Sequence, residues 1–259
     1  MKSDFTKLAF VLAVVLIAGA IAFNYYTGAQ ADKNSGSGES FTKKEIQEIV
    51  KETISENPEI IVEAFQKYQK DQRQAQQEKQ REQFLANKDE LFEDNNSPTI
   101  GSDNPDAVTI VEFFDYNCGY CKRAIGAVNK VIDTEENVRF IFKEFPILSE
   151  SSELAAKYAL AAEKQDKYLE FHTALMEFKG PKNEESLTKL AKDMGLDVNK
   201  LKKDANSEEV NKEIQETKAL ARKLGISGTP AFIIGDDLSP GYIPYEQMKA
   251  MIEKARKEG

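Results

Sequence analysis

The chain of 259 residues contains only two cysteines, Cys118 and Cys121, which stand two residues apart. They follow the apolar run Val108–Phe114, and the residues after them are typical of a helix. A strand that leads into C-x-x-C at the start of a helix is typical of a redox motif. Both sulfurs then lie on the first helical turn, where free N–H groups and the helix dipole favour a thiolate at the first. A thiolate beside a second thiol can exchange disulfides with another protein.

Two other uses of the cysteine pair stay open. A structural disulfide would close a very small loop, so its entropic stabilisation would be small. A zinc site normally needs three or four protein ligands, and the chain adds only one histidine, His172. We interpret His172, which lies in YLEFHTAL on a predicted helix, as a packing or surface residue. We therefore favour redox chemistry, with no metal and no cofactor other than the Cys118–Cys121 disulfide.

The composition describes a globular protein that carries a very polar section. Hydrophobic residues make up 41% of the chain and charged residues 31%. The formal net charge is -9 at pH 7, and the isoelectric point is near 5.0. An acidic chain is poorly suited to bind phosphate backbones, so we expect no nucleic-acid partner.

Residues 1–31 are predicted to direct export, as a signal peptide or a signal-anchor. Lys2 and Lys7 lie at the start of this segment, and residues 8–23 carry no charged or polar side chain. That run is long for a signal peptide and short for a membrane span of about 20 residues. Cleavage after Ala31 would follow the A-x-A pattern, but two tyrosines before it suit a membrane interface. We favour an inner-membrane anchor, and either outcome places the cysteines in the periplasm or cell envelope, where disulfides persist.

Residues 32–40 (DKNSGSGES) are predicted to be a flexible linker, and residues 41–97 a helical stalk or oligomerisation region. Thr42 and Glu45 predict a capping box, and Pro58 is well placed to begin a second helix. Apolar residues then recur at helical spacing, namely Ile46, Ile49, Val50, Ile54, Ile60, Ile61, Ala64, Phe65 and Tyr68. Two interpretations stay open: a polar spacer, or a self-association module. We favour the second because this apolar face has no partner in its own segment.

Residues 98–259 are predicted to form an α/β domain. Its elements are, in order, a strand over 107–114, a helix over 122–133, a strand over 138–145, helices within 149–225, a strand over 228–235, a turn over 236–241 and a helix over 245–257. The first strand, helix and second strand form a β-α-β unit, whose strands should be parallel. The helices between the second and third strands predict a helical insertion.

This order of elements resembles that of DsbA-type thioredoxin-fold proteins. The resemblance covers residues 108–255 and rests on FFDYNCGYCK, on the Gly228-Thr229-Pro230 segment and on the helices between them. With the N-terminal helices, the chain also resembles the membrane-linked or oligomeric branch that includes the ScsC proteins. The resemblance implies a thioredoxin-like α/β fold with a helical insertion, preceded by the signal or anchor and the helical region.

The resemblance also implies a role for individual residues. Cys118 would be the attacking thiol and Cys121 the buried resolving thiol. Thr229 and Pro230 would form a cis-proline segment, against which a client chain lies as an added strand. Glu112 falls where thioredoxin-fold proteins keep a buried acid. Because an unpaired buried charge is costly, we interpret Glu112 as a carboxyl with a raised pKa that handles the proton of Cys121. The alternative is a solvent-facing position on an edge strand.

The residues between the cysteines indicate the direction of exchange. DsbA oxidases have Pro-His there, and the histidine cation stabilises the thiolate, whereas this chain has Gly119-Tyr120. Gly-Tyr with Thr before the proline is the combination of DsbC-type isomerases. We therefore predict thiol–disulfide exchange on exported cysteine-containing proteins, closer to an isomerase or reductase, with a membrane redox partner and a homo-oligomer through residues 41–92. A DsbA-like oxidase stays open, as does a chaperone or surface-assembly protein whose cysteines only brace a helix.

Overall fold

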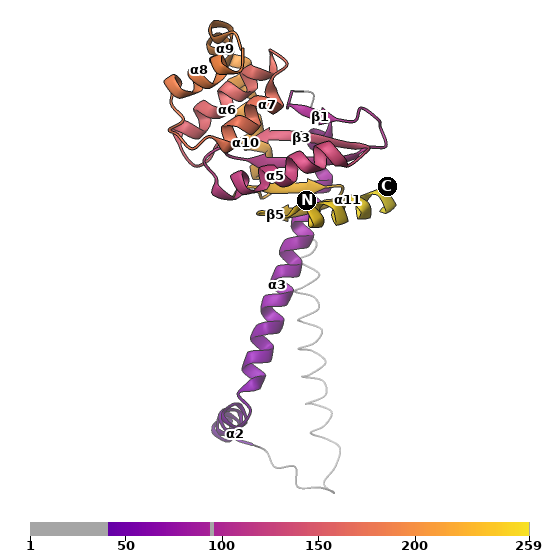
Figure 1. The fold of residues 1–259 in the computed structure, drawn as a ribbon. Helices are drawn as coiled ribbons and strands as arrows, with labels where there is room; N and C mark the ends of the chain where they lie inside the picture. The colour runs from indigo at the N-terminus through magenta and orange to yellow at the C-terminus, as the bar shows by residue number, and fades with distance from the viewer. Residues whose placement is uncertain (1–40, 94–95, 259) are drawn as a thin grey trace, which may run out of the picture. The chain divides into compact units, whose positions relative to one another are not determined.

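A computed structural model describes residues 41–93 and 96–258 (Figure 1). The predicted signal or anchor, residues 1–31, and the linker, residues 32–40, lie outside the described residues. Of the helices that the structure describes, none is both long and apolar enough to span a membrane. The chain divides into two compact units, the first ending at Tyr68 and the second comprising Gln69–Gly259.

The first unit contains helix α2 (Lys43–Glu56) and the beginning of helix α3 (Glu59–Ala86). The predicted capping box is confirmed: the Glu45 backbone N–H donates to Thr42 Oγ1 over 3.3 Å, and the Thr42 N–H donates to Glu45 Oε2 over 2.7 Å. Helix α3 begins at Glu59, one residue after the predicted start at Pro58. The large apolar side chains of this unit are exposed, namely Ile46, Ile49, Val50, Ile54, Ile60, Ile61, Val62, Phe65 and Tyr68.

The second unit is built on a five-stranded mixed sheet in the order β1-β3-β2-β4-β5. The strands are β1 (Thr99–Gly101), β2 (Val108–Phe114), β3 (Val138–Glu144), β4 (Ala231–Ile234) and β5 (Asp237–Pro240). Strands β2 and β3 are parallel, which confirms the β-α-β unit, and helix α5 (Gly119–Thr134) connects them. The other three pairings are antiparallel.

The predicted helical insertion is confirmed, and residues 149–225, all of which are described, contain no strand. Its helices are α6 (Glu150–Glu163), α7 (Tyr168–Glu177), α8 (Glu184–Asp193), α9 (Val198–Ala205) and α10 (Glu208–Lys223). The sequence did not predict α9, because only Leu201 and Ala205 of its eight residues are buried and so mark no long apolar stripe. Helix α11 (Tyr245–Glu258) ends the described chain.

Two short strands were not predicted, and the predicted turn over 236–241 is wrong for residues 237–240, since the turn itself is confined to residues 235–236. Asp237–Pro240 forms β5, which pairs with β4 as a hairpin, and Thr99–Gly101 forms β1 against β3. Both strands lie at sheet edges and contain residues that are poor strand formers, such as Asp237 and Pro240. Their conformation is therefore stabilised by backbone pairing with a neighbouring strand, which no local pattern reports. With these corrections, the predicted thioredoxin-like α/β fold is confirmed.

Two apolar clusters cover the sheet, and side chains of β2 alternate between them. Ile110 and Phe114 belong to the cluster that contains Cys118, Cys121 and helix α5. Val111 and Phe113 belong to the other, which also contains two residues from before the sheet, Phe84 of α3 and Leu91 of α4 (Lys88–Phe92). The predicted domain boundary at residue 98 therefore does not coincide with the packing, since the region around residues 84–91 is part of the core of the second unit.

Candidate active site around Cys118 and Cys121

The two cysteines are free thiols at the start of helix α5. Cys118 is the N-cap residue, and its sulfur accepts the backbone N–H of Cys121 at 3.4 Å. Cys118 is 8% exposed and Cys121 1% exposed, so the first thiol is the one that another protein can reach. An N–H directed at the sulfur stabilises a thiolate there, as the helix N-terminus does.

The Thr229–Pro230 peptide bond is cis and lies against the motif. The thiol of Cys118 donates to the carbonyl oxygen of Thr229 at 3.2 Å, across 111 residues of sequence. The sheet explains this proximity, because Phe113 pairs with Ala231 and β4 runs antiparallel to β2. The segment before β4 therefore lies at the same end of the strands as the motif that follows β2.

Glu112 is buried beneath the motif. Its strand, β2, is the middle one of the sheet, and its side chain is 2% exposed, so the edge-strand alternative is wrong. By the alternation of β2, Glu112 points to the face of Ile110 and Phe114, which is also the face of Cys121. Burial, and then the charge of Cys118, raises the pKa of Glu112 to about 8. Within the described protein, Glu112 Oε2 has no hydrogen-bond partner.

Cys121 has an environment that opposes its ionisation. Burial is the main cause that raises the pKa of Cys121, and the charge of Glu112 raises it further. A thiol of this kind reacts only if a neighbouring group accepts its proton during the attack. Glu112 is a carboxyl close enough to affect the thiol electrostatically, with a pKa near neutrality.

The residues between the cysteines face solvent. Gly119 is exposed, and the Tyr120 side chain is 61% exposed. No cation stands between the two sulfurs in the sequence, but the sequence reasoning missed a lysine that packs beside the motif. Burial, and then the neighbouring Lys122, lowers the pKa of Lys182 to about 8. Lys182 comes from the segment between α7 and α8, so only the fold brings it to the motif.

Asp115 and Asn117 join the motif to the segment after β3 through hydrogen bonds. The sequence reasoning gave these two residues no role. Asp115 is buried, and its carboxyl oxygens accept the backbone N–H groups of Asn117 at 2.7 Å, of Ile147 at 2.9 Å and of Leu148 at 3.0 Å. The Asn117 amide nitrogen lies 2.9 Å from Ser149 Oγ, the N-cap of α6. In the sequence, an acidic residue directly after an apolar strand was the available sign that Asp115 has such a role. Its partners Ile147 and Leu148 lie some thirty residues further along the chain, so the sequence does not show them.

His172 is a packing residue in a buried polar network. Its Nδ1 lies 3.0 Å from the hydroxyl of Tyr116, which donates to Glu144 Oε1 at 2.8 Å, and Tyr168 donates to the same oxygen at 3.0 Å. Burial lowers the pKa of His172 to about 3 and raises the pKa of Glu144. The histidine is therefore neutral at pH 7, and its ring packs against Phe114 and Phe142.

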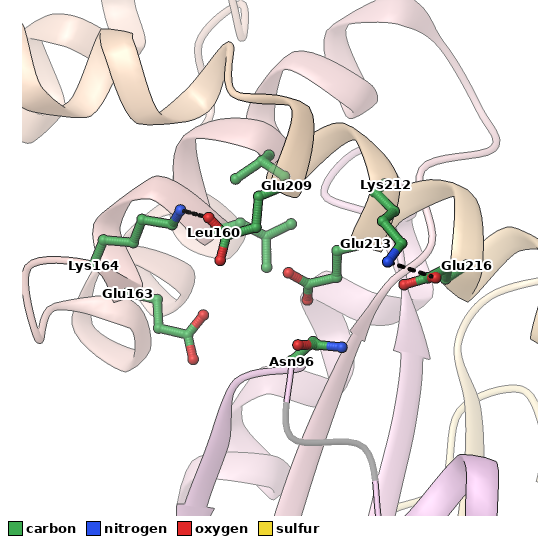
Figure 2. Close-up of a pocket in the computed structure, with 9 residues that line it drawn as sticks. Asn96, Leu160, Glu163, Lys164, Glu209, Lys212, Glu213 and Glu216 are labelled. Carbon is green, nitrogen blue, oxygen red and sulfur yellow. Dashed lines mark hydrogen bonds and ion pairs between the residues drawn. The ribbon is translucent and has the colours of Figure 1, made fainter.

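No metal-binding cluster of three or more His, Cys, Asp or Glu side chains occurs among the described residues. A pocket of about 300 Å³ lies between α6 and α10, and Figure 2 shows its lining. Glutamates dominate it, but two of them pair with lysines, Glu209 with Lys164 and Glu216 with Lys212. None of the predicted site residues lines this pocket, so the cysteine motif is the candidate active site.

Known proteins share both parts of the chain. Residues 109–253 match the model of the DSBA-like thioredoxin domain, and residues 43–75 match that of the copper resistance protein ScsC N-terminal domain. The chain belongs to the DsbA-like thioredoxin-domain family. The predicted likeness to DsbA-type and ScsC-type proteins is thereby confirmed.

Solved structures and curated proteins agree with this membership. A thioredoxin-like oxidoreductase from Silicibacter pomeroyi is 46% identical, with a TM-score of 0.62 over 65% of this chain and 97% of that one. A linker-deletion variant of Proteus mirabilis ScsC is 31% identical, with a TM-score of 0.63 over 86% of this chain and 100% of that one. Disulfide bond formation protein D of Bacillus subtilis is 28% identical over 62% of this chain and 77% of its own length. The chain also matches curated Na(+)/H(+) antiporters, of which it spans only about a quarter of the length, for example 23% of NhaA 1 of Salinispora arenicola.

Proposed function

We propose that this DsbA-like protein catalyses thiol–disulfide exchange with exported cysteine-containing proteins. The observation that carries the proposal is the position of Cys118, at the N-terminus of α5 and 3.2 Å from the carbonyl oxygen of Thr229. A thiol in this place lies at the N-terminal end of the helix dipole and beside a segment whose Pro230 lacks an N–H. An extended client can lie along such a segment and bring its own sulfur to Cys118.

The exchange proceeds through a mixed disulfide. The Cys118 thiolate attacks one sulfur of a client disulfide, the Cys118–client bond forms, and the other client sulfur leaves as a thiolate. In isomerisation, a different client thiolate then attacks the mixed disulfide and releases Cys118. In reduction, Cys121 attacks Cys118 Sγ, its proton passes to the Glu112 carboxylate, and the client sulfur leaves as a thiolate, which then takes a proton from solvent. The Cys118–Cys121 disulfide then needs two electrons from a redox partner, for which we propose a membrane protein.

We propose that the isomerase and reductase directions predominate over oxidation. The support is Gly119-Tyr120, which places no cation between the cysteines, and the buried Cys121, whose attack depends on Glu112. A slow second thiol leaves time for the client to rearrange before Cys121 releases it. An oxidase would instead need a strongly stabilised Cys118 thiolate and a strongly oxidising disulfide.

Refolding of a scrambled multi-disulfide substrate in a glutathione buffer tests this direction. We expect the chain from residue 32 onward to restore native disulfides, and the Cys118→Ser variant to restore none. Rapid oxidation of a reduced substrate without isomerisation would show an oxidase. A reduction potential near that of DsbA, about -120 mV, would also overturn the proposed direction.

We further propose that residues 41–92 support self-association. The support is the row of exposed apolar side chains on α2 and on the start of α3, since a contiguous exposed apolar surface is typical of a protein–protein contact. An isomerase gains from two or more active sites around one client. Light scattering on Ile49→Lys/Phe65→Lys in the chain from residue 32 onward should report monomers where the unsubstituted chain forms an oligomer. Equal masses for both would remove this proposal.

The proposed compartment is the periplasm or cell envelope. Its support is the apolar run over 8–23 and the likeness to a periplasmic thioredoxin-like protein from Salmonella enterica serovar Typhimurium, 33% identical. The location is tested by labelling Cys118 with a membrane-impermeant thiol reagent in cells whose outer membrane has been permeabilised and whose inner membrane is intact. Labelling that requires lysis of the inner membrane would contradict it.

A further inference from the structure

Two consecutive apolar side chains beside the motif begin an exposed segment, residues 147–150. Ile147 is 40% exposed and Leu148 is 54% exposed, whereas Phe145 and Pro146 directly before them are buried. Single exposed apolar residues are common on protein surfaces. These two are consecutive, and they follow the end of β3 that lies beside the end of β2, where Cys118 follows.

The sheet places this pair on the opposite side of Cys118 from the cis-proline. Strand β2 leads to the motif, with β4 as its neighbour on one side and β3 on the other. Phe113 pairs with Ala231, so Pro230 lies at the motif end of β4. Phe114 pairs with Glu144, so the segment that contains Ile147 and Leu148 leaves β3 at the same end. Cys118 therefore lies between the cis-proline segment and the apolar pair.

The pair is held in place by the motif itself. One carboxyl oxygen of Asp115, a fully buried residue three positions before Cys118, accepts the N–H groups of both Ile147 and Leu148. Its other oxygen accepts the N–H of Asn117. These hydrogen bonds use backbone atoms, so the two side chains are left free to face outward. A surface that is already ordered binds a partner with less loss of conformational entropy.

We infer that Ile147 and Leu148 form an apolar subsite for the client, which receives a hydrophobic side chain near the client's cysteine. The inference rests on the proposed function and specifies its substrate class: extended, unfolded segments in which an apolar residue accompanies the cysteine. Neighbouring strands are about 4.8 Å apart and an extended chain advances about 3.3 Å per residue. A client whose sulfur meets Cys118 therefore reaches the subsite with a residue roughly two or three positions away.

The test uses two synthetic peptides, each with one cysteine in a mixed disulfide with 5-thio-2-nitrobenzoate. One peptide carries leucine two and three positions from the cysteine on both sides, and the other carries serine there. Attack by the reduced Cys118 forms the Cys118–peptide disulfide and releases the coloured thiolate, whose absorbance gives the rate constant. The symmetrical reagent, 5,5'-dithiobis(2-nitrobenzoate), measures the reactivity of Cys118 without a peptide.

The unsubstituted protein should react about tenfold faster with the leucine peptide than with the serine peptide. In Ile147→Ser/Leu148→Ser this preference should fall to about one, while the rate with the symmetrical reagent stays within twofold. Leu85→Ser is the control, because Leu85 is 49% exposed on α3 and is not part of the site. It should keep the full preference.

Three results would overturn the inference: no preference in the unsubstituted protein, a preference that survives the double substitution, or an equal loss with both peptides and the symmetrical reagent. The last result would mean that the segment only supports the motif. Failure of the proposed function looks different, since the unsubstituted protein would then release no thiolate from any of the three reagents.

Discussion

The thiol of Cys118 donates a hydrogen bond to the carbonyl oxygen of Thr229 at 3.2 Å, and the N–H of Cys121 is directed at the same sulfur at 3.4 Å. The first contact needs the thiol proton, while the second strengthens when the sulfur is charged. Cys118 Sγ therefore contacts both the first turn of α5 and the cis-proline segment that we propose to bind clients.

The first prediction concerns the order in which the two thiols act. Cys121→Ser should accumulate a mixed disulfide between Cys118 and client proteins, because the resolving thiol is missing. Cys118→Ser should accumulate none, because Cys121 is buried beneath it. Non-reducing gels and mass spectrometry of the trapped species measure this. Trapping through Cys121 in the Cys118→Ser variant would contradict the assignment.

The second prediction concerns Glu112 and the stability of the reduced protein. Burial raises the pKa of Glu112 from 4.5 to about 8, so the folded state retains a proton that the unfolded state has lost. Stability is therefore full below pH 4.5 and falls as the pH rises to about 8, by an amount on the order of 5 kcal/mol. Urea unfolding of Glu112→Gln should lack this fall. The same substitution should slow release of a mixed disulfide by Cys121 at least tenfold, because the proton acceptor is lost.

A parallel decline of the two proteins between pH 5 and pH 8 would contradict the buried position of the carboxyl. Unchanged release kinetics in Glu112→Gln would contradict only its part in proton transfer. The two measurements therefore separate the environment of Glu112 from its proposed role.

The third prediction concerns the residue at position 120. Tyr120→His places a titratable cation between the cysteines, where it stabilises a Cys118 thiolate and so the reduced form. We expect the reduction potential to rise by about 30 mV, which corresponds to a change of about 1.4 kcal/mol in the two-electron equilibrium. Equilibration with glutathione measures it. Tyr120→Phe is the matched control and should leave the potential unchanged.

The fourth prediction concerns His172. Its pKa falls from 6.5 to about 3 in the folded state, so the unfolded chain binds a proton that the folded protein does not. Stability from this source is full above pH 6.5 and is lost as the pH falls toward 3, by an amount on the order of 5 kcal/mol. His172→Phe, which keeps a ring beside Phe114 and Phe142, should show a shallower acid decline in urea unfolding. An identical slope in both proteins would contradict the assignment.

The fifth prediction separates the core of the second unit from the exposed helices. Phe84 is buried against Phe92, with ring centroids 5.9 Å apart, whereas Phe65 on the same helix is exposed. Phe84→Ala should destabilise the second unit by about 3–4 kcal/mol, since it leaves a cavity. Phe65→Ala should leave its stability unchanged. Equal effects in chemical denaturation would place Phe84 outside the core.

Local pattern in the sequence was sufficient for much of this protein. Short stretches of sequence were enough to predict the cysteine pair after an apolar strand, the β-α-β unit, the helical insertion and the Thr42–Glu45 capping box. They depend on spacing, capping chemistry and alternation of apolar residues, which act between near neighbours. The elements that were missed, β1, β5 and α9, are those whose own residues contribute little of their stability.

The supporting parts of the site were decided by tertiary structure alone. Glu112 is a buried acid only because β4, more than a hundred residues later, pairs with β2 and makes it an inner strand. Asp115 holds Ile147 and Leu148 only because β3 returns parallel to β2 and ends at the same edge. Burial and hydrogen bonding between distant segments depend on which strands are neighbours, and a residue's type and local spacing do not encode that order. The sequence alone therefore indicated the two thiols as the candidate site, and the fold determined which groups surround them.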